Sequence, residues 1–226
     1  MTIRAGLLTA FSLVSAWLSL GNARADVSIT NPSFETLPPG GLTYETCGVG
    51  CSDSYNVPIP GWTSGINTGQ WQPGSSSGNF TYFNYVPNGL TVAFSNGGPI
   101  TQTVGATVVA GDIYTLSVFV GDRSSGISGQ SYVGLIVNGY NYRVLATPSS
   151  PGTWADWTAT YTGTATDAGD PITIELLPYG NGQGDYDNVT LTQTSATPEP
   201  RFDGLLALGL GGLMLAARLR HAKQAV

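Results

Sequence analysis

The sequence predicts an all-β sandwich between residues 26 and 196. Runs rich in β-branched and aromatic residues recur there, and turn signals such as Asn138-Gly139 separate them, a pattern typical of sandwiches. No amphipathic helical pattern interrupts these runs. Strands are expected over residues 91–94, 100–104, 113–120, 131–137, 141–146, 154–162, 172–177 and 186–193.

Local patterns refine this expectation. Asn138-Gly139 predicts a hairpin with a type I′ turn. The alternation in residues 154–162 predicts that Trp157, Ala159 and Tyr161 face the core. Residues 35–89 are rich in Gly, Pro, Ser and Asn, and few strands are expected there. Within that region, residues 70–89 are expected to form a long surface loop of the kind that often carries binding residues.

Residues 1–25 are typical of a secretory signal peptide that forms a signal helix. Arg4 precedes an apolar stretch that ends at Leu20, and the small residues Ala23 and Ala25 suit a signal peptidase. Cleavage is therefore expected after Ala25, and the mature domain is expected to span residues 26–196. A buried N-terminal helix is the alternative interpretation.

The C-terminal region, residues 197–226, contains a second apolar segment. Residues 204–217 carry no charge and would form a helix about 21 Å long, shorter than a hydrocarbon core of about 30 Å. Arg218, Arg220 and Lys223 follow directly, which suits a cytoplasmic end, and long basic side chains extend the effective span. The segment predicts a C-terminal transmembrane helix.

Pro198-Glu199-Pro200, the apolar segment and the Arg-rich end together resemble the PEP-CTERM sorting signal, although Thr197 stands where Val is usual. The resemblance implies an exported protein whose tail inserts transiently into the inner membrane and is processed by an exosortase. The expected destination is then the cell surface or the extracellular matrix. Permanent anchoring through the tail is the alternative.

The charge distribution excludes whole classes of function. Twelve of the 14 acidic residues lie in the mature domain, but only two of the eight basic residues do, Arg123 and Arg143. Nucleic-acid binding needs many basic side chains, so it is excluded. The only histidine, His221, lies in the tail, which removes histidine-based nucleophilic catalysis and histidine-bearing zinc sites from the domain.

The two cysteines of the chain, Cys47 and Cys51, form the sequence CGVGC. In an exported protein this spacing favours a structural disulfide. A redox function is the alternative, although redox pairs favour C-x-x-C at the start of a helix.

Three short motifs resemble the galactose-binding-like jelly rolls of carbohydrate-binding modules: VSITNPSFE (27–35), IPGW (59–62) and GDYDNVTL (184–191). The resemblance implies a jelly-roll β-sandwich whose first and last strands share one sheet. It also implies a structural Ca²⁺ held by Glu35 and Asp187, with Asp185 as a weaker candidate; such a cation takes six to eight oxygen ligands. The alternative is that Glu35 is solvated and Asp187 only caps a turn.

Aromatic side chains between residues 62 and 85 alternate with amide side chains. Such rings can stack on sugars, so Trp71, Tyr82 and Tyr85 are the predicted ligand-binding residues. Packing of these rings in the core is the alternative. The sequence is thus interpreted as a non-enzymatic envelope or matrix protein that binds an exopolysaccharide, with no catalytic residue. A purely structural matrix component is the alternative, and a glycoside hydrolase, which needs only two suitably spaced carboxylates, is less favoured.

Overall fold

The structure is a computed structural model that describes residues 23–43, 51–74, 82–124 and 127–196. Residues Ala23–Ala196 form one compact unit. Residues 1–22 of the predicted signal peptide, the sorting motif and the predicted transmembrane helix lie outside the described residues, whereas Arg24 and Ala25 belong to the first strand. Within the described ranges, no helix has the length and apolar character needed to cross a bilayer.

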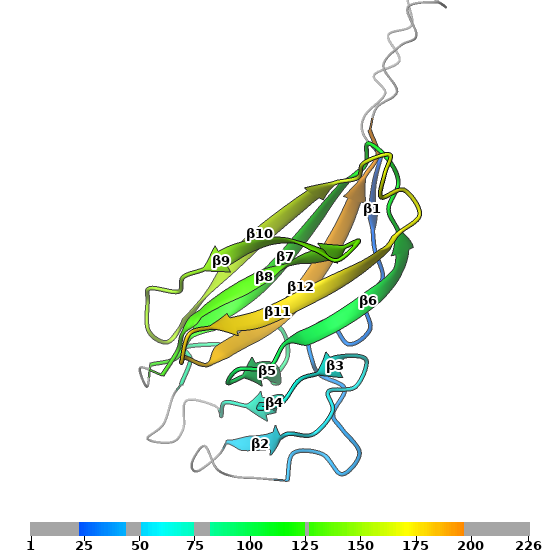
Figure 1. Cartoon of the computed structure of the whole chain (residues 1–226). Coiled ribbons are helices and arrows are strands. Elements are labelled where there is room, and N and C mark those ends of the chain that lie inside the picture. The colour runs from blue at the N-terminus through cyan, green and yellow to red at the C-terminus, as the bar shows by residue number, and fades with distance from the viewer. Residues whose placement is uncertain (1–22, 44–50, 75–81, 125–126, 197–226) are drawn as a thin grey trace, which may run out of the picture. The chain divides into compact units, whose positions relative to one another are not determined.

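Two antiparallel sheets make up the domain (Figure 1). The strands are β1 (Arg24–Asp26), β2 (Ser52–Tyr55), β3 (Thr63–Ser64), β4 (Thr68–Gln72), β5 (Val92–Ser95), β6 (Ile100–Thr107), β7 (Ile113–Asp122), β8 (Gln130–Val137), β9 (Tyr140–Ala146), β10 (Thr153–Thr162), β11 (Pro171–Tyr179) and β12 (Gly184–Thr194). The predicted jelly-roll β-sandwich is confirmed, and each of the eight expected strands is present.

The seven-stranded sheet has the order β10-β7-β12-β5-β4-β2, and β1 pairs with the far part of β12. The five-stranded sheet has the order β3-β6-β11-β8-β9. The first and last strands therefore share one sheet, as the jelly-roll resemblance implied. Ala25 is opposite Gln193 in this pairing, and the Val27 amide donates to the Leu191 carbonyl at 2.8 Å.

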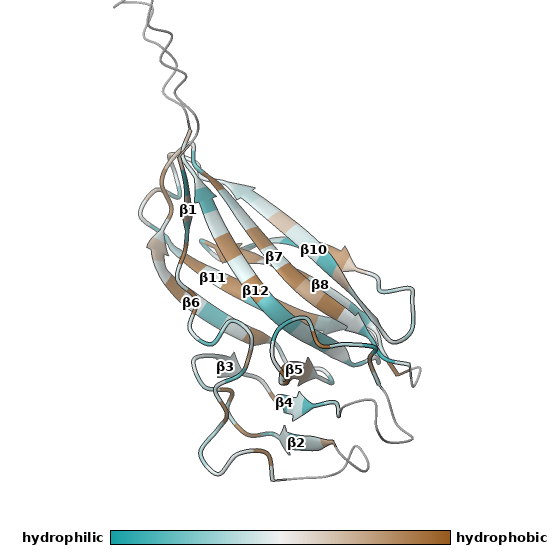
Figure 2. Cartoon of the chain, turned by 180° about the vertical axis from the view of Figure 1, so that it is seen from behind, coloured by the Kyte–Doolittle hydropathy of each residue, from teal (hydrophilic) through white to brown (hydrophobic). Residues whose placement is uncertain are grey.

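The main core lies between the two sheets, where apolar side chains alternate with polar ones along each strand (Figure 2). Ala159 and Tyr161 are buried in it and Trp157 packs against it, as predicted. Asn138 and Gly139 both have positive φ, 50° and 77°, so the β8–β9 hairpin has the expected type I′ turn.

A second apolar cluster covers the opposite face of the seven-stranded sheet. We call it the outer cluster; its buried members are Cys51, Trp71, Phe83, Val92, Phe94 and Trp154. Strand alternation explains its place, because Val118 and Val120 on β7 belong to the main core while Phe119 between them packs on the outer cluster. One end of this sheet is thus covered on both faces.

Residues 70–89 differ from the expected surface loop. Gln70, Trp71 and Gln72 belong to β4, and among the described residues, 73–74 and 82–89 run as non-strand chain before β5. Strands β2, β3 and β4 have two to five residues each. Their apolar alternation is too short to stand out among glycines and prolines, so the sequence pattern did not reveal them.

Candidate functional site

A strap formed by residues 82–91 runs across the outer cluster. The Ser124 amide, just after β7, donates to the Tyr82 carbonyl at 3.0 Å. The Trp154 indole N–H donates to the Tyr85 carbonyl at 2.8 Å. These bonds tie the strap to the strands on which the outer cluster is built.

Four aromatic rings form a continuous wall in the outer cluster. The ring centroid of Trp71 lies 5.2 Å from that of Tyr82 and 5.9 Å from that of Phe83. Phe83 in turn lies 4.4 Å from Trp154. Edge-on and tilted arrangements of this kind are the favourable ones for aromatic pairs. The wall packs directly against Gly121, and a larger residue would not fit there, because its Cβ would lie 2.7 Å from the Phe83 ring.

Asp185 places a fully buried carboxyl group beside this wall. It lies on β12 opposite Gly121, and its neighbour Tyr186 points to the other side, into the main core. Burial raises the pKa of Asp185 to about 7, although the charge of Arg123 and the Gln183 amide act to lower it. The group is therefore largely a neutral acid below about pH 7 and could donate a proton.

The two oxygens of Asp185 have different surroundings. Oδ1 accepts a hydrogen bond from Gln183 Nε2 at 2.7 Å. Oδ2 is buried and has no hydrogen-bond partner among the described residues. The nearby indole N–H of Trp71 also lowers the pKa of Asp185, but Trp71 Nε1 makes no hydrogen bond of regular geometry. Oδ2 is thus the oxygen left for a ligand.

Arg123 completes the polar part of the site. Its side chain is buried, and its Nη1 donates to Gln183 Oε1 at 2.8 Å. Its Cζ lies 4.7 Å from the Trp71 ring centroid and 4.3 Å from that of Tyr82, so two rings hold the guanidinium by cation–π contact. Because arginine cannot accept a hydrogen bond, the Gln183 oxygen must face it and the amide nitrogen must face Asp185.

The predicted calcium ligands Glu35 and Asp187 come near each other at the end of the strap. Glu35 Oε1 accepts hydrogen bonds from the amides of Leu90 and Thr91, at 2.9 and 2.7 Å. Asp187 Oδ2 accepts one from the amide of Asn88 at 2.8 Å. Burial is the main cause that raises the pKa of Asp187 to about 7; the amides of Asn88 and Asn188 act to lower it, and the negative charge of Glu35 acts to raise it.

The third predicted metal ligand lies apart from this pair. Asp185 belongs to the polar group with Gln183 and Arg123, as described above. In the described part of the chain, no group of three or more His, Cys, Asp or Glu side chains is arranged to hold a metal ion.

The structure brings two of the three predicted ligand-binding aromatics together. Trp71 is almost completely buried and contacts Tyr82, which is partly buried. Tyr85 contributes its backbone carbonyl to the site, while its side chain is 51% exposed. Cys51 is disulfide-bonded; its predicted partner Cys47 lies outside the described residues, so the pairing stays a prediction.

Several site residues were missed by the sequence interpretation: Phe83 and Trp154 in the wall, and Arg123 and Gln183 in the polar group. One available signal was Arg123, because it is one of only two basic residues in the acidic domain. Nothing in the local sequence of Gln183 or Trp154 marks them. Trp154 meets the site through the pairing of β10 with β7, and Gln183 stands just before β12, where its amide reaches Asp185.

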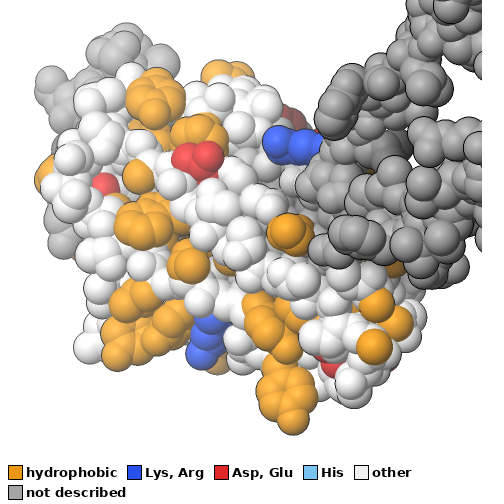
Figure 3. All heavy atoms as spheres, turned by 90° about the horizontal axis from the view of Figure 1, so that it is seen from above, with side chains coloured by type: hydrophobic (Ala, Val, Ile, Leu, Met, Phe, Trp, Pro, Cys, Tyr) orange, Lys and Arg blue, Asp and Glu red, His pale blue; other side chains and the backbone are white. Residues whose placement is uncertain are grey.

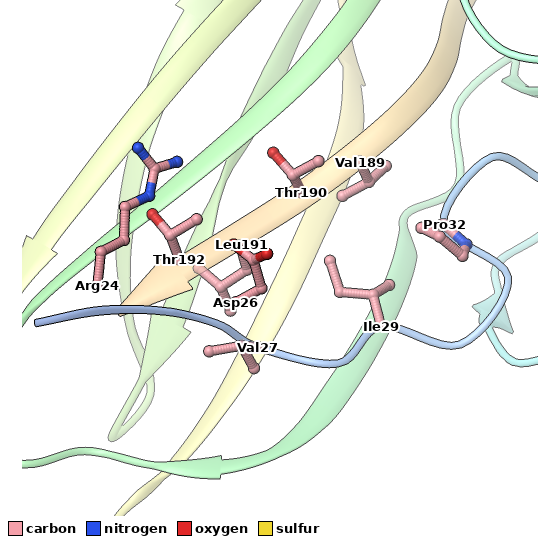
Figure 4. A pocket seen from close by; sticks show the side chains of 9 residues that line it. All are labelled: Arg24, Asp26, Val27, Ile29, Pro32, Val189, Thr190, Leu191 and Thr192. Carbon is pink, nitrogen blue, oxygen red and sulfur yellow. The ribbon is translucent and has the colours of Figure 1, made fainter. Parts of the chain in front are cut away.

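Elsewhere the domain offers less chemistry. A pocket of about 290 Å³ lies between β1 and the later part of β12 (Figure 4). Its floor is apolar, with Val27, Ile29 and Leu191, and Arg24 and Asp26 lie at its side. On the face shown in Figure 3, apolar side chains are scattered among uncharged polar ones and few charged groups are visible.

Comparison with solved structures identifies similar folds. A cyclase from Fischerella sp. in its apo form matches with a TM-score of 0.62 at 21% identity, over 77% of this chain and 98% of that chain. The Stig cyclase Fisc from Fischerella sp. TAU, in complex with (3Z)-3-(1-methyl-2-pyrrolidinylidene)-3H-indole, matches with 0.62 at 20%, over 77% and 100%. A cyclase from the same organism, in complex with 4-(1H-indol-3-yl)butan-2-one, matches with 0.59 at 20%, over 76% and 100%.

Carbohydrate-binding modules match with TM-scores of 0.38 to 0.44. A comparison with curated proteins finds no match.

The family comparison corrects the predicted function. Residues 25–192 match the HpiC1-like family, described as HpiC1 cyclase. The expectation of a non-enzymatic protein without a catalytic residue is therefore wrong, and so are polysaccharide binding and a purely structural matrix function as its purpose. Buried rings and a buried acid suit a reaction site, whereas the sequence interpretation favoured rings that stack on a polysaccharide. The chain belongs to the HpiC1-like family of cyclases.

Proposed function

We propose that this protein catalyses an acid-initiated cyclisation, with Asp185 as the proton donor. The observation that carries the proposal is the buried Asp185 carboxyl group, whose Oδ2 has no partner among the described residues and which stands beside an aromatic wall. A general acid must be protonated at the working pH and must present its proton to the substrate. Family membership supplies the reaction class.

The proposed chemistry needs one proton and returns it. Asp185 Oδ2 donates its proton to one carbon of a substrate double bond and leaves a carbocation on the other carbon. An electron pair from the substrate's aromatic ring attacks that carbocation and closes the new carbon–carbon ring. The ring then loses a proton, which the Asp185 carboxylate accepts. The product is an isomer of the substrate, and no oxidant or reductant is required.

The aromatic wall suits this intermediate. Rings such as Trp71, Phe83 and Trp154 attract a cation through their electron-rich faces. Burial excludes water, which would otherwise capture the carbocation. Similar buried rings without a proton donor would bind an aromatic compound but could not start the reaction.

An indole that carries an alkenyl side chain is the proposed substrate class. Two cyclases of similar fold are solved with indole-containing compounds. Indole is also large, flat and electron-rich, which matches a wall of aromatic rings and supplies the nucleophilic carbon that the closing step needs.

A structural Ca²⁺ at Glu35 and Asp187 is part of the proposal. Two acidic groups interact there unfavourably, and no salt bridge to a basic side chain relieves either of them among the described residues. A divalent cation would remove that repulsion and is compatible with carboxylate oxygens. Held there, it would join the chain before β2 to β12 and to the strap, and its contribution would be to stability.

The test is incubation of the purified protein, with Ca²⁺ present, with a panel of 3-alkenylindoles in H₂O and in D₂O. Liquid chromatography with mass detection is expected to show a new peak of unchanged mass in H₂O. In D₂O the product is expected to gain one deuterium, because the donated proton exchanges with solvent.

Two variants separate the proposed chemistry from other causes. Asp185→Asn keeps the shape and removes the acid, so product formation is expected to fail. Glu175→Gln changes a carboxylate on β11 of the other sheet and is expected to retain activity. Equal turnover by wild type and Asp185→Asn would show that Asp185 is not the acid.

A further inference from the structure

The guanidinium of Arg123 has a function that proton donation by Asp185 does not explain. Among the described residues the only salt bridge is that of Arg143 with Glu175, on the other sheet, so no described carboxylate lies within salt-bridge distance of Arg123. The charge of Arg123 acts on Asp185, but Asp185 is largely a neutral acid below about pH 7, and a buried charge that nothing neutralises is destabilising. Such a destabilising arrangement is expected in a site where a bound ligand supplies the missing negative charge.

The contacts of Arg123 show which of its N–H groups is available to a ligand. Nη1 is engaged by Gln183, and the rings of Trp71 and Tyr82 flank the group. Nε is buried and has no hydrogen-bond partner among the described residues. Trp71 Nε1, near Asp185, is a second buried donor without a hydrogen bond of regular geometry.

Both unpartnered nitrogens are donors, so they call for an acceptor. An oxygen of a carboxylate meets this need better than a neutral group, because charge-assisted hydrogen bonds to arginine are about twice as strong as neutral ones. The rings that hold Arg123 also belong to the wall against which the substrate ring would stack. The acceptor oxygen and the aromatic ring would therefore belong to the same small molecule.

We propose that Arg123 is a specificity-determining residue that binds a carboxylate carried by the aromatic substrate. This inference rests on the proposed function, since it concerns the same site, and it adds a requirement for a negatively charged group near the ring. The substrate class becomes an indole with both an unsaturated side chain and a carboxylate.

A matched pair of probes isolates the charge. The first is 4-(1H-indol-3-yl)butan-2-one, the ketone found with a cyclase of similar fold. The second is 3-(1H-indol-3-yl)propanoate, in which a carboxylate oxygen replaces the methyl group of that ketone. Isothermal titration calorimetry at about 0.15 M salt would measure both dissociation constants, so that long-range repulsion by the acidic domain is screened.

Wild-type protein is expected to bind the propanoate roughly ten- to a hundredfold more tightly than the ketone. Arg123→Met is expected to abolish that preference, because it removes the charge that distinguishes the carboxylate from the ketone. Arg123→Lys keeps the charge without the planar group, and an intermediate preference is expected. Arg143→Met is the matched control, because Arg143 also lies over a tyrosine ring, 4.0 Å from the Tyr132 centroid, but on the other sheet.

The outcomes separate the two proposals. Equal affinity of wild type for ketone and propanoate, or a preference that survives Arg123→Met, overturns the assignment of Arg123 while cyclisation by Asp185 can stand. No binding of either probe overturns both this assignment and the indole class. Thermal unfolding of Arg123→Met and Arg123→Lys shows whether each variant is folded, and one folded variant is sufficient to decide.

Discussion

Gln183 donates a hydrogen bond through Nε2 to Oδ1 of Asp185, over 2.7 Å, and thereby fixes which oxygen of the acid is free. The amide cannot turn round, because its oxygen accepts from Arg123. A proton on Asp185 is therefore best placed on Oδ2, beside the aromatic wall. The site is thus a directed acid, and its behaviour can be tested residue by residue.

Replacing Asp185 by asparagine is expected to reduce cyclisation by roughly 10²- to 10⁴-fold, the range that a positioned general acid contributes. The variant is expected to fold, because a neutral amide replaces a neutral acid of nearly the same shape. Initial rates of isomer formation would measure the loss, with Glu175→Gln as the control. A loss below threefold in folded protein would contradict the assignment.

The stability of the Ca²⁺-free protein is expected to fall as the pH rises from about 4 to about 7. Burial raises the pKa of Asp185 from the ordinary 3.8 to about 7, so in this range the folded state holds a proton that the unfolded state has released. This loss of stability is complete above about pH 7, where the folded state has released the proton as well. Urea unfolding at several pH values should show a smaller fall for Asp185→Asn, with the rest due to Asp187. A parallel fall in both proteins would argue against the raised pKa.

Catalysis is expected to follow the same ionisation. Because only the neutral acid can donate, the rate should be highest below about pH 7 and decline above it. A pH–rate profile under saturating substrate would check this, at pH values where unfolding curves show the protein to be folded. A rate that rises through pH 7 and beyond would indicate a basic group as the initiator.

Calcium at a hundred times its dissociation constant is expected to raise the melting temperature by about 5–10 °C. Asp187→Asn should lose most of this response, because it removes one of the two proposed charged ligands. Differential scanning calorimetry with and without a chelator would measure it. Glu175→Gln should keep the full response, and an unchanged melting temperature in wild type would contradict the site.

Gly121→Ala is expected to disturb the site more than the fold. Its Cβ would lie 2.7 Å from the Phe83 ring and 3.0 Å from that of Trp154, so the wall must shift. Overpacking of this kind costs about 1–3 kcal/mol. Indole binding should weaken, as calorimetry would show. Gly105→Ala on β6, where the new Cβ meets open space, is the matched control; equal effects of both would contradict the wall.

The all-β class and the later strands could be predicted because each of these strands carries its own alternation of apolar and polar residues. Residues 154–162, for example, place Ala159 and Tyr161 in the core by a rule that needs no partner strand. Strands β2 to β4 could not be found in this way, because two to five residues hold too little periodicity.

The arrangement of the site, in contrast, could not be predicted from the sequence. The sequence predicts Asp185 as a metal ligand and Trp71 and Tyr82 as ligand-binding residues, but it does not predict that the three are buried together. The sequence by itself determined the sandwich, the acidic charge and the absence of histidine from the domain. Only the tertiary structure decided that Asp185, Gln183 and Arg123 meet under the wall. The physical reason is that strand pairing brings β12 beside β7, far from it in the sequence, and that burial changes the chemistry of a side chain.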